Sequence, residues 1–209
     1  MARITGAKCR ICRRLGTKLF LKGTRCDTAK CPIERENRPP GAHGAKRIRL
    51  TEYGIHLREV QRAKKMYGVM QTQFRRYYDE AIAKPGNTGE YLMQILERRL
   101  DNVVYRLRMG SSRHHSRQII GHGHIRVNGK KVTIPSYQVD AGDVIEGAKR
   151  EKSQKIIKES LAMRKDMQAV PSWLKMVEDQ VVGTVVTLPT ASELQVPLES
   201  QLVVEFMSR

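Results

Sequence analysis

The sequence has few acidic residues for its length, and this scarcity makes the chain strongly basic. Its 209 residues include 39 Lys and Arg but only 21 Asp and Glu, which gives a formal net charge of +18 and a pI near 10.1. The excess is uneven, because the first 50 residues hold 14 basic and 3 acidic residues, whereas the last 59 hold 7 and 8. This asymmetry predicts a polyanionic partner that contacts the first three quarters of the chain.

Aromatic residues and long apolar runs are also scarce. Phe, Trp and Tyr make up 5% of the chain and do not alternate with basic residues as they do in sheets that stack RNA bases. The longest apolar stretch, residues 181–188, is interrupted by Gly183 and Thr184, so a membrane span of about 20 apolar residues is not expected. We therefore expect a cytoplasmic protein that recognises the phosphates and shape of folded RNA, with no membrane or small-molecule partner.

Cysteine is absent after residue 31, and the four cysteines before it are clustered. Cys9, Cys12, Cys26 and Cys31 follow the pattern C-x2-C-x13-C-x4-C. Without a secretory signal, such a cluster binds metal more often than it forms disulfides, and four thiolates complete the tetrahedral shell of a structural Zn²⁺. Two alternatives remain open: a 4Fe-4S cluster, which takes the same four ligands, and metal-free reduced thiols.

Downstream of the cysteines the pattern changes from loop to helix. Prolines and glycines within residues 35–49 predict an extended basic arm. Apolar spacing then predicts two helices within residues 52–83, separated at Gly68, and one long amphipathic helix from Leu92 to Leu107. The apolar segments of residues 181–209 predict short strands that pack near the helical part.

Residues 111–145 have the pattern of a short helix followed by a hairpin. Ser112 and Gly121 fit the start and end of the helix. The dipeptide Asn128-Gly129 lies between two alternating apolar segments and predicts a two-residue type I′ turn. We expect Arg113 and Arg117 on an exposed face of this helix.

These features together predict an α+β fold. Its parts are an N-terminal metal-bound loop, a helical domain, and an inserted small RNA-binding module of two helices and a β-hairpin sheet. The expected boundaries are residues 1–45 for the metal knuckle and basic arm, 46–98 for the helical domain, and 99–165 for the RNA-binding module.

Several motifs resemble the family of bacterial small-subunit ribosomal protein four. Within the module these are LDNVVYRL at residues 100–107, SR at 112–113, SRQ at 116–118, GHI at 123–125, VNG at 127–129, PSYQV at 135–139 and GD at 142–143. Outside it they are GTKLFLKG at 16–23, GAHGA at 41–45, LRE at 57–59, YGV at 67–69, GNTGE at 86–90 and QLVVEF at 201–206. The likeness therefore extends across the chain.

The resemblance implies a structural constituent of the small ribosomal subunit that binds the 5′ domain of its rRNA and nucleates assembly of the subunit body. It also implies contact with ribosomal protein five, a contribution to translational accuracy, and a basic loop at Lys46, Arg47 and Arg49 that faces the path by which mRNA enters. Cysteine ligands occur in only some members, so the four cysteines resemble the metal-bearing branch. The candidate rRNA-binding residues are Arg3, Lys8, Arg10, Arg13, Arg14, Lys22, Arg25, Arg38, Arg58, Arg62, Arg106, Arg113, His114, Ser116, Arg117, Asn128, Lys130 and Lys131.

Two other classes of function compete with this interpretation. Pseudouridine synthases carry the same module and a catalytic aspartate in an Arg-Leu-Asp motif, which Arg99-Leu100-Asp101 matches. Here the tripeptide precedes the module, and only 59 residues follow position 150, too few for a catalytic domain, so we interpret Asp101 as part of a helix-surface ion pair and expect no enzyme. A zinc-dependent DNA-binding regulator would need a recognition helix beside the cysteines, where residues 13–31 are loop-like.

Overall fold

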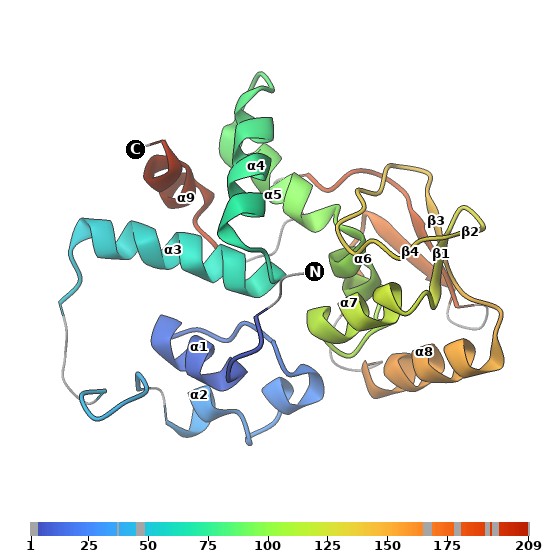
Figure 1. Cartoon of the computed structure of the whole chain (residues 1–209), viewed down its shortest axis with the longest axis horizontal. Coiled ribbons are helices and arrows are strands. Elements are labelled where there is room, and N and C mark those ends of the chain that lie inside the picture. The colour runs from blue at the N-terminus through green and yellow to red at the C-terminus, as the bar shows by residue number, and fades with distance from the viewer. Residues whose placement is uncertain are drawn as a thin grey trace. The chain divides into compact units, whose positions relative to one another are not determined.

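A computed structural model describes residues 4–36, 38–44, 49–164, 169–177, 181–190, 193 and 197–208. The chain forms two compact units, one of residues 1–93 and 196–209 and the other of residues 94–195 (Figure 1). We call them unit 1 and unit 2. None of the helices within the described ranges is both long and apolar enough to span a bilayer.

The amino-terminal part of unit 1 contains short helices where the sequence predicted loop. They are α1 (Lys8–Leu15), the 3-10 helix η1 (Gly23–Asp27) and α2 (Pro32–Arg35). Helix α1 buries Cys12 and Leu15 and ends at Gly16, whose φ of 72° is favourable for glycine. The prediction of loop was wrong here because the 8 residues of α1 are fewer than the stretch over which apolar periodicity identifies a helix.

The helical part of unit 1 begins as predicted. Helix α3 (Glu52–Tyr67) starts at Thr51, whose hydroxyl accepts a hydrogen bond from Gly54 N, and stops at Gly68, whose φ is 64°. Helix α4 (Gln71–Ile82) follows, and then α5 (Thr88–Glu97), which continues into unit 2. The two helices predicted on either side of Gly68 are confirmed.

The last helix of unit 1 corrects a prediction. Residues 202–206 were expected to form a strand, but they belong to helix α9 (Ser200–Met207), which lies beside α3 in Figure 1. Val203 and Met207, four residues apart, are both buried, and the Phe206 ring packs 5.3 Å from the Tyr53 ring of α3. The β-branched pair Val203-Val204 favours a strand locally, but packing against α3 outweighs that preference.

Unit 2 begins with a break that the sequence did not reveal. The predicted continuous helix from Leu92 to Leu107 is instead α5, which ends at Glu97, and α6 (Leu100–Arg106). Arg99 lies between them with extended backbone and forms a bridge to Gln138, while Leu100 N donates to Tyr137 O. The break arises because the loop at residues 135–138 supplies backbone partners that compete with the helix.

The strands of unit 2 are β1 (Ile125–Val127), β2 (Lys130–Lys131), β3 (Val144–Gly147), β4 (Leu174–Val177) and β5 (Val182–Val185). They form a five-stranded antiparallel sheet in the order β2-β1-β3-β5-β4. Asn128 and Gly129 have φ angles of 50° and 75°, so the predicted type I′ turn is confirmed. The expected strand at residues 131–134 is shorter, and the strand at residues 182–185 pairs with β3 and belongs to unit 2 rather than to the helical part of unit 1.

The core of unit 2 joins this sheet to helices α6, α7 (Arg113–Gly121) and α8 (Glu151–Arg164). Leu107 and Trp173 are both almost completely buried in it. Gly183 of β5 allows Leu107 to approach closely, because a Cβ at that position would lie 2.5 Å from Leu107 Cδ1. The α+β class is therefore confirmed, and β4 and β5 enlarge the sheet beyond the hairpin that the sequence predicted.

Candidate nucleic-acid interface

The predicted rRNA-binding residues differ widely in exposure. Arg113 and Ser116 are buried. The exposed ones are Arg10, Arg14, Lys22, Arg25, Arg38, Asn128, Lys130 and Lys131, and the half-buried ones are Lys8, Arg13, Arg58, Arg62, Arg106, His114 and Arg117. Arg49, predicted beside the mRNA path, is exposed, whereas Arg3, Lys46 and Arg47 lie outside the described residues.

In unit 1 the structure brings the four cysteines to one small cavity. Cys9, Cys12, Cys26 and Cys31 line it together, and the last three are buried. Burial raises the pKa of the thiols of Cys12 and Cys26 above the ordinary value. Lys22 N donates to Cys26 Sγ at 3.4 Å, and all four cysteines are unbridged.

The cysteine side chains stand near one another without forming a ligand shell. Across the ranges that the structure describes, no group of three or more His, Cys, Asp or Glu side chains is placed so that it could hold a metal ion. The cluster therefore matches the predicted ligand set in number, chemical type and place around one cavity, but not in the arrangement of its sulfur atoms.

In unit 2 the hairpin displays an exposed basic pair. Lys130 and Lys131 form β2, at one edge of the sheet, with both side chains exposed. The Asn128 side-chain amide holds the turn in place through two hydrogen bonds. Its Nδ2 donates to Asp143 Oδ1 at 2.8 Å, and its Oδ1 accepts from Val144 N at 2.9 Å. The two lysines suit a contact with phosphate, whereas Asn128 stabilises the turn that presents them.

Helix α7 packs its predicted RNA-facing residues partly inward. Its N-cap Ser112 accepts a hydrogen bond from His115 N at 3.2 Å, as expected. Ser116 is completely buried beside Gly110, where a Cβ would lie 2.3 Å from Ser116 Oγ. Within the described residues the Ser116 hydroxyl has no hydrogen-bond partner. Ser116 thus contributes its small size, which lets α7 approach the backbone at Gly110.

Arg113 corrects the expectation of an exposed arginine. Its side chain is buried, its Nε donates to Asn102 Oδ1 at 2.8 Å, and its guanidinium lies 4.5 Å from the centre of the Tyr105 ring. Arg164 of α8 lies 4.2 Å from the same ring centre and donates to the carbonyl oxygens of Tyr105 and Gly110 at 2.8 and 3.0 Å. These contacts stabilise the packing of α6 against α7 and α8, and a role of Arg113 in binding RNA stays a prediction.

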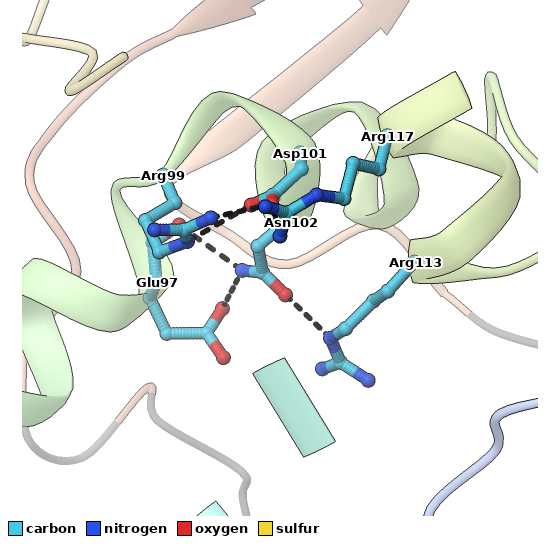
Figure 2. A network of polar contacts seen from close by, with 6 residues as sticks. All are labelled: Glu97, Arg99, Asp101, Asn102, Arg113 and Arg117. Carbon is cyan, nitrogen blue, oxygen red and sulfur yellow. Dashed lines mark hydrogen bonds and ion pairs between the residues drawn. The ribbon is translucent and has the colours of Figure 1, made fainter. Parts of the chain in front are cut away.

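The Asn102 amide is the centre of this buried polar network (Figure 2). Its Nδ2 donates to the Glu97 carbonyl oxygen at 3.0 Å and to Glu97 Oε2 at 2.7 Å. The Glu97 carboxylate also accepts from Arg106 Nε and Nη2 at 3.0 and 2.9 Å. Glu97 and Asn102 were not predicted from the sequence, because two polar residues in an amphipathic segment give no signal that both are buried.

Asp101 and Arg99 form the second branch of the network. Arg99 Nε and Nη2 donate to the two oxygens of the Asp101 carboxylate at 3.1 and 2.6 Å, and both residues are buried. The expected helix-surface ion pair is therefore an interior one. Arg117 of α7, half-buried, places Nη1 3.5 Å from Asp101 Oδ2 (Figure 2). The Arg-Leu-Asp tripeptide is thus part of the support of α6 and α7.

These features define a class of protein: a basic, two-unit α+β protein whose second unit presents a lysine-bearing hairpin and a supported basic helix, the arrangement expected of a module that binds folded RNA. The sequence-family model of the Ribosomal protein S4/S9 N-terminal domain matches residues 3–97, and the sequence-family model of the S4 domain matches residues 98–145. The chain belongs to the ribosomal protein S4 family.

Full-length relatives support the same assignment. The chain is 50% identical to the small ribosomal subunit protein uS4 of Thermodesulfovibrio yellowstonii and 51% identical to that of Halothermothrix orenii. It is also 51% identical to the small ribosomal subunit protein uS4A of Symbiobacterium thermophilum. Each match covers 100% of both chains. The family resemblance is confirmed, and so is the choice of a ribosomal protein over a pseudouridine synthase.

Proposed function

We propose that this protein binds the rRNA of the small ribosomal subunit as a structural constituent of the ribosome in the cytoplasm. The observation that carries the proposal is a full-length match to ribosomal relatives together with exposed basic side chains in both units, such as Arg14 and Arg25 in unit 1 and Lys130 and Lys131 in unit 2. Because exposed lysine and arginine neutralise phosphates and release counterions, such surfaces bind RNA without a stacking platform.

The finer role that we propose is early binding to the 5′ domain of the rRNA, which nucleates assembly of the subunit body. We also propose contact with ribosomal protein five, an effect on translational accuracy, and a position of the loop at Lys46, Arg47 and Arg49 along the path by which mRNA enters. The family resemblance of the sequence supports these roles, and exposure of Arg49 is compatible with the last one.

Binding to a transcript of the 5′ domain tests the proposal. We expect the logarithm of the association constant to fall linearly with the logarithm of the salt concentration, with a slope of about −0.7 to −0.9 for each phosphate contacted. Replacing Lys130 and Lys131 together by Ala should weaken binding and make the slope shallower by about two. A matched control replaces Lys155 and Lys158 of α8 together by Ala, which removes two exposed charges outside the candidate residues. Affinity that does not change with salt would contradict the proposal.

We further propose that Cys9, Cys12, Cys26 and Cys31 bind one structural metal ion, with Zn²⁺ preferred and a 4Fe-4S cluster as the alternative. Their convergence on one cavity supports the proposal, as does the small number of buried apolar side chains in α1 and α2. The metal would replace a hydrophobic core and hold the basic side chains around it in place.

Metal analysis with an absorption spectrum of anaerobically purified protein tests the metal site. One zinc per chain without visible absorption supports Zn²⁺, whereas iron, sulfide and a brown colour support the cluster. Cys26→Ser should lower the metal content and speed proteolysis of the first 50 residues, because one lost thiolate leaves the shell incomplete. Two results together would contradict the metal site: purified wild-type protein that contains no metal, and a Cys26→Ser variant that is cleaved no faster than the wild type. The four thiols would then be reduced and metal-free.

A further inference from the structure

Arg117 is the most exposed member of the polar network in Figure 2. Its side chain is 19% exposed, whereas the side chains of Asp101 and Arg99 are 5% and 2% exposed. Its guanidinium reaches Asp101 from the neighbouring helix, α7, over a distance of 3.5 Å. Through Arg117 the network therefore extends from the interior of unit 2 toward its surface.

Asp101 is itself held in place from the interior. Arg99 binds both of its carboxylate oxygens, and Asp101 N donates to Pro135 O at 3.1 Å. A side-on pair of this kind fixes the plane of a carboxylate as well as its position. The carboxylate that faces Arg117 thus has one orientation, set by Arg99 and the first turn of α6.

A fixed carboxylate behind a surface arginine has an effect that its charge alone would not produce. Near an RNA phosphate, a negative charge is repulsive and should weaken binding. A guanidinium, however, is planar and has five N–H donors in a rigid fork, so an ion pair on one edge restricts the direction of the other donors. Asp101 can therefore lower the entropy that Arg117 loses when it binds an anion.

We propose that Asp101 is a positioning residue that orients the Arg117 guanidinium for contact with a backbone phosphate of RNA. The proposal rests on the proposed rRNA binding and names one site within it. Asp101 lies behind Arg117 and does not itself touch the RNA. Arg113, one turn earlier on α7, binds Asn102 and belongs to the interior support of the helix.

The test measures affinity for a 5′-domain rRNA transcript at several salt concentrations. Arg117→Ala should weaken binding about tenfold and make the salt slope shallower by about one. Arg117→Lys should weaken it nearly as much, because an ammonium keeps the charge but not the planar fork. Asp101→Asn should also weaken it severalfold, although the substitution makes the protein more positive.

A double variant separates positioning from a general effect on the fold. If Asp101 acts through Arg117, Asp101→Asn should cause no further loss of affinity in the Arg117→Ala protein. Asp79→Asn is the matched control, because Asp79 pairs with Arg75 at 3.3 Å in an exposed ion pair of α4, and this variant should bind as tightly as the wild type or slightly more tightly. Fluorescence of the single Trp, Trp173, checks that unit 2 remains folded in each variant.

The outcomes distinguish the two proposals. If the wild type does not bind the transcript, rRNA binding itself fails. If the wild type binds but Asp101→Asn binds equally or more tightly, or its loss adds to that of Arg117→Ala, the positioning role is overturned while rRNA binding stands. Asp101→Asn could unfold, because it leaves the buried Arg99 guanidinium without its carboxylate. In that case the affinity of the Arg117→Lys protein is the test, and an affinity equal to that of the wild type overturns the proposal.

Discussion

Asn102→Ala should be among the most destabilising single substitutions in unit 2. Asn102 is 1% exposed and makes three hydrogen bonds, to the Glu97 carbonyl oxygen, to the Glu97 carboxylate and to the Arg113 guanidinium. A hydrogen bond to a charged group contributes about 1.5 to 3 kcal/mol, and two of the three are of this kind. Alanine would leave a buried carboxylate and a buried guanidinium without this partner, so we expect a loss of about 3 to 5 kcal/mol in the free energy of unfolding.

Urea denaturation followed by Trp173 fluorescence measures this loss directly. Trp173 is the single tryptophan of the chain and is 1% exposed in the core of unit 2, so its emission reports the unfolding of that unit. Asn128→Gly is the matched control, because it removes the two hydrogen bonds of an exposed asparagine amide and tolerates the φ of 50°, and we expect it to cost only about 1 kcal/mol. A loss below about 1 kcal/mol for Asn102→Ala would refute the view that its amide joins α5, α6 and α7.

Two other predictions use the same assay. Leu107→Ala should cost about 2 to 5 kcal/mol, because Leu107 is 0% exposed and fills the space beside Gly183; a loss under about 1 kcal/mol would contradict that packing. Burial lowers the pKa of His115 below its ordinary value of about 6.5, and its Nδ1 accepts from Ser111 N at 3.2 Å, as a neutral ring can. The unfolded state therefore takes up the proton first, and the contribution of His115 to stability is present above about pH 6.5 and falls as the pH drops below it. The free energy of unfolding of His115→Gln should depend less on pH between about 5 and 7.5 than that of the wild type, and equal dependence would refute this assignment.

Elements with strong local signals were predicted correctly from the sequence. Gly68 ends α3, Ser112 begins α7, and Asn128-Gly129 form the hairpin turn, because each of these residues acts on backbone within a few positions of itself. The helix at residues 200–207 was missed for the opposite reason. Its conformation depends on contact with α3, more than 130 residues earlier, and such a partner leaves no mark on the local pattern.

The candidate interface was predicted less completely than the fold. Basic residues in exposed turns and strands, such as Lys130 and Lys131, could be identified because glycine and asparagine mark the turn that presents them. The support of α7 could not be foreseen, because Glu97, Asn102 and Arg113 come together only when the α5–α6 break and the start of α7 are placed in three dimensions. Spacing along one helix cannot reveal that a polar side chain has a partner on another.

The positive charge of this chain consequently serves two different purposes. Arg99, Arg113 and Arg164 are almost fully buried, and their contacts are with a carboxylate, an amide, backbone carbonyl oxygens and an aromatic ring. Arginine suits these sites because its guanidinium holds five donors in one plane and stacks on a ring, whereas the three donors of a lysine ammonium have no planar arrangement. Lysine is found instead on the exposed hairpin, where a mobile point charge can neutralise a phosphate without a fixed orientation. Arg→Lys substitution should therefore be tolerated at exposed positions such as Arg10 and Arg14 and should destabilise unit 2 at the buried ones.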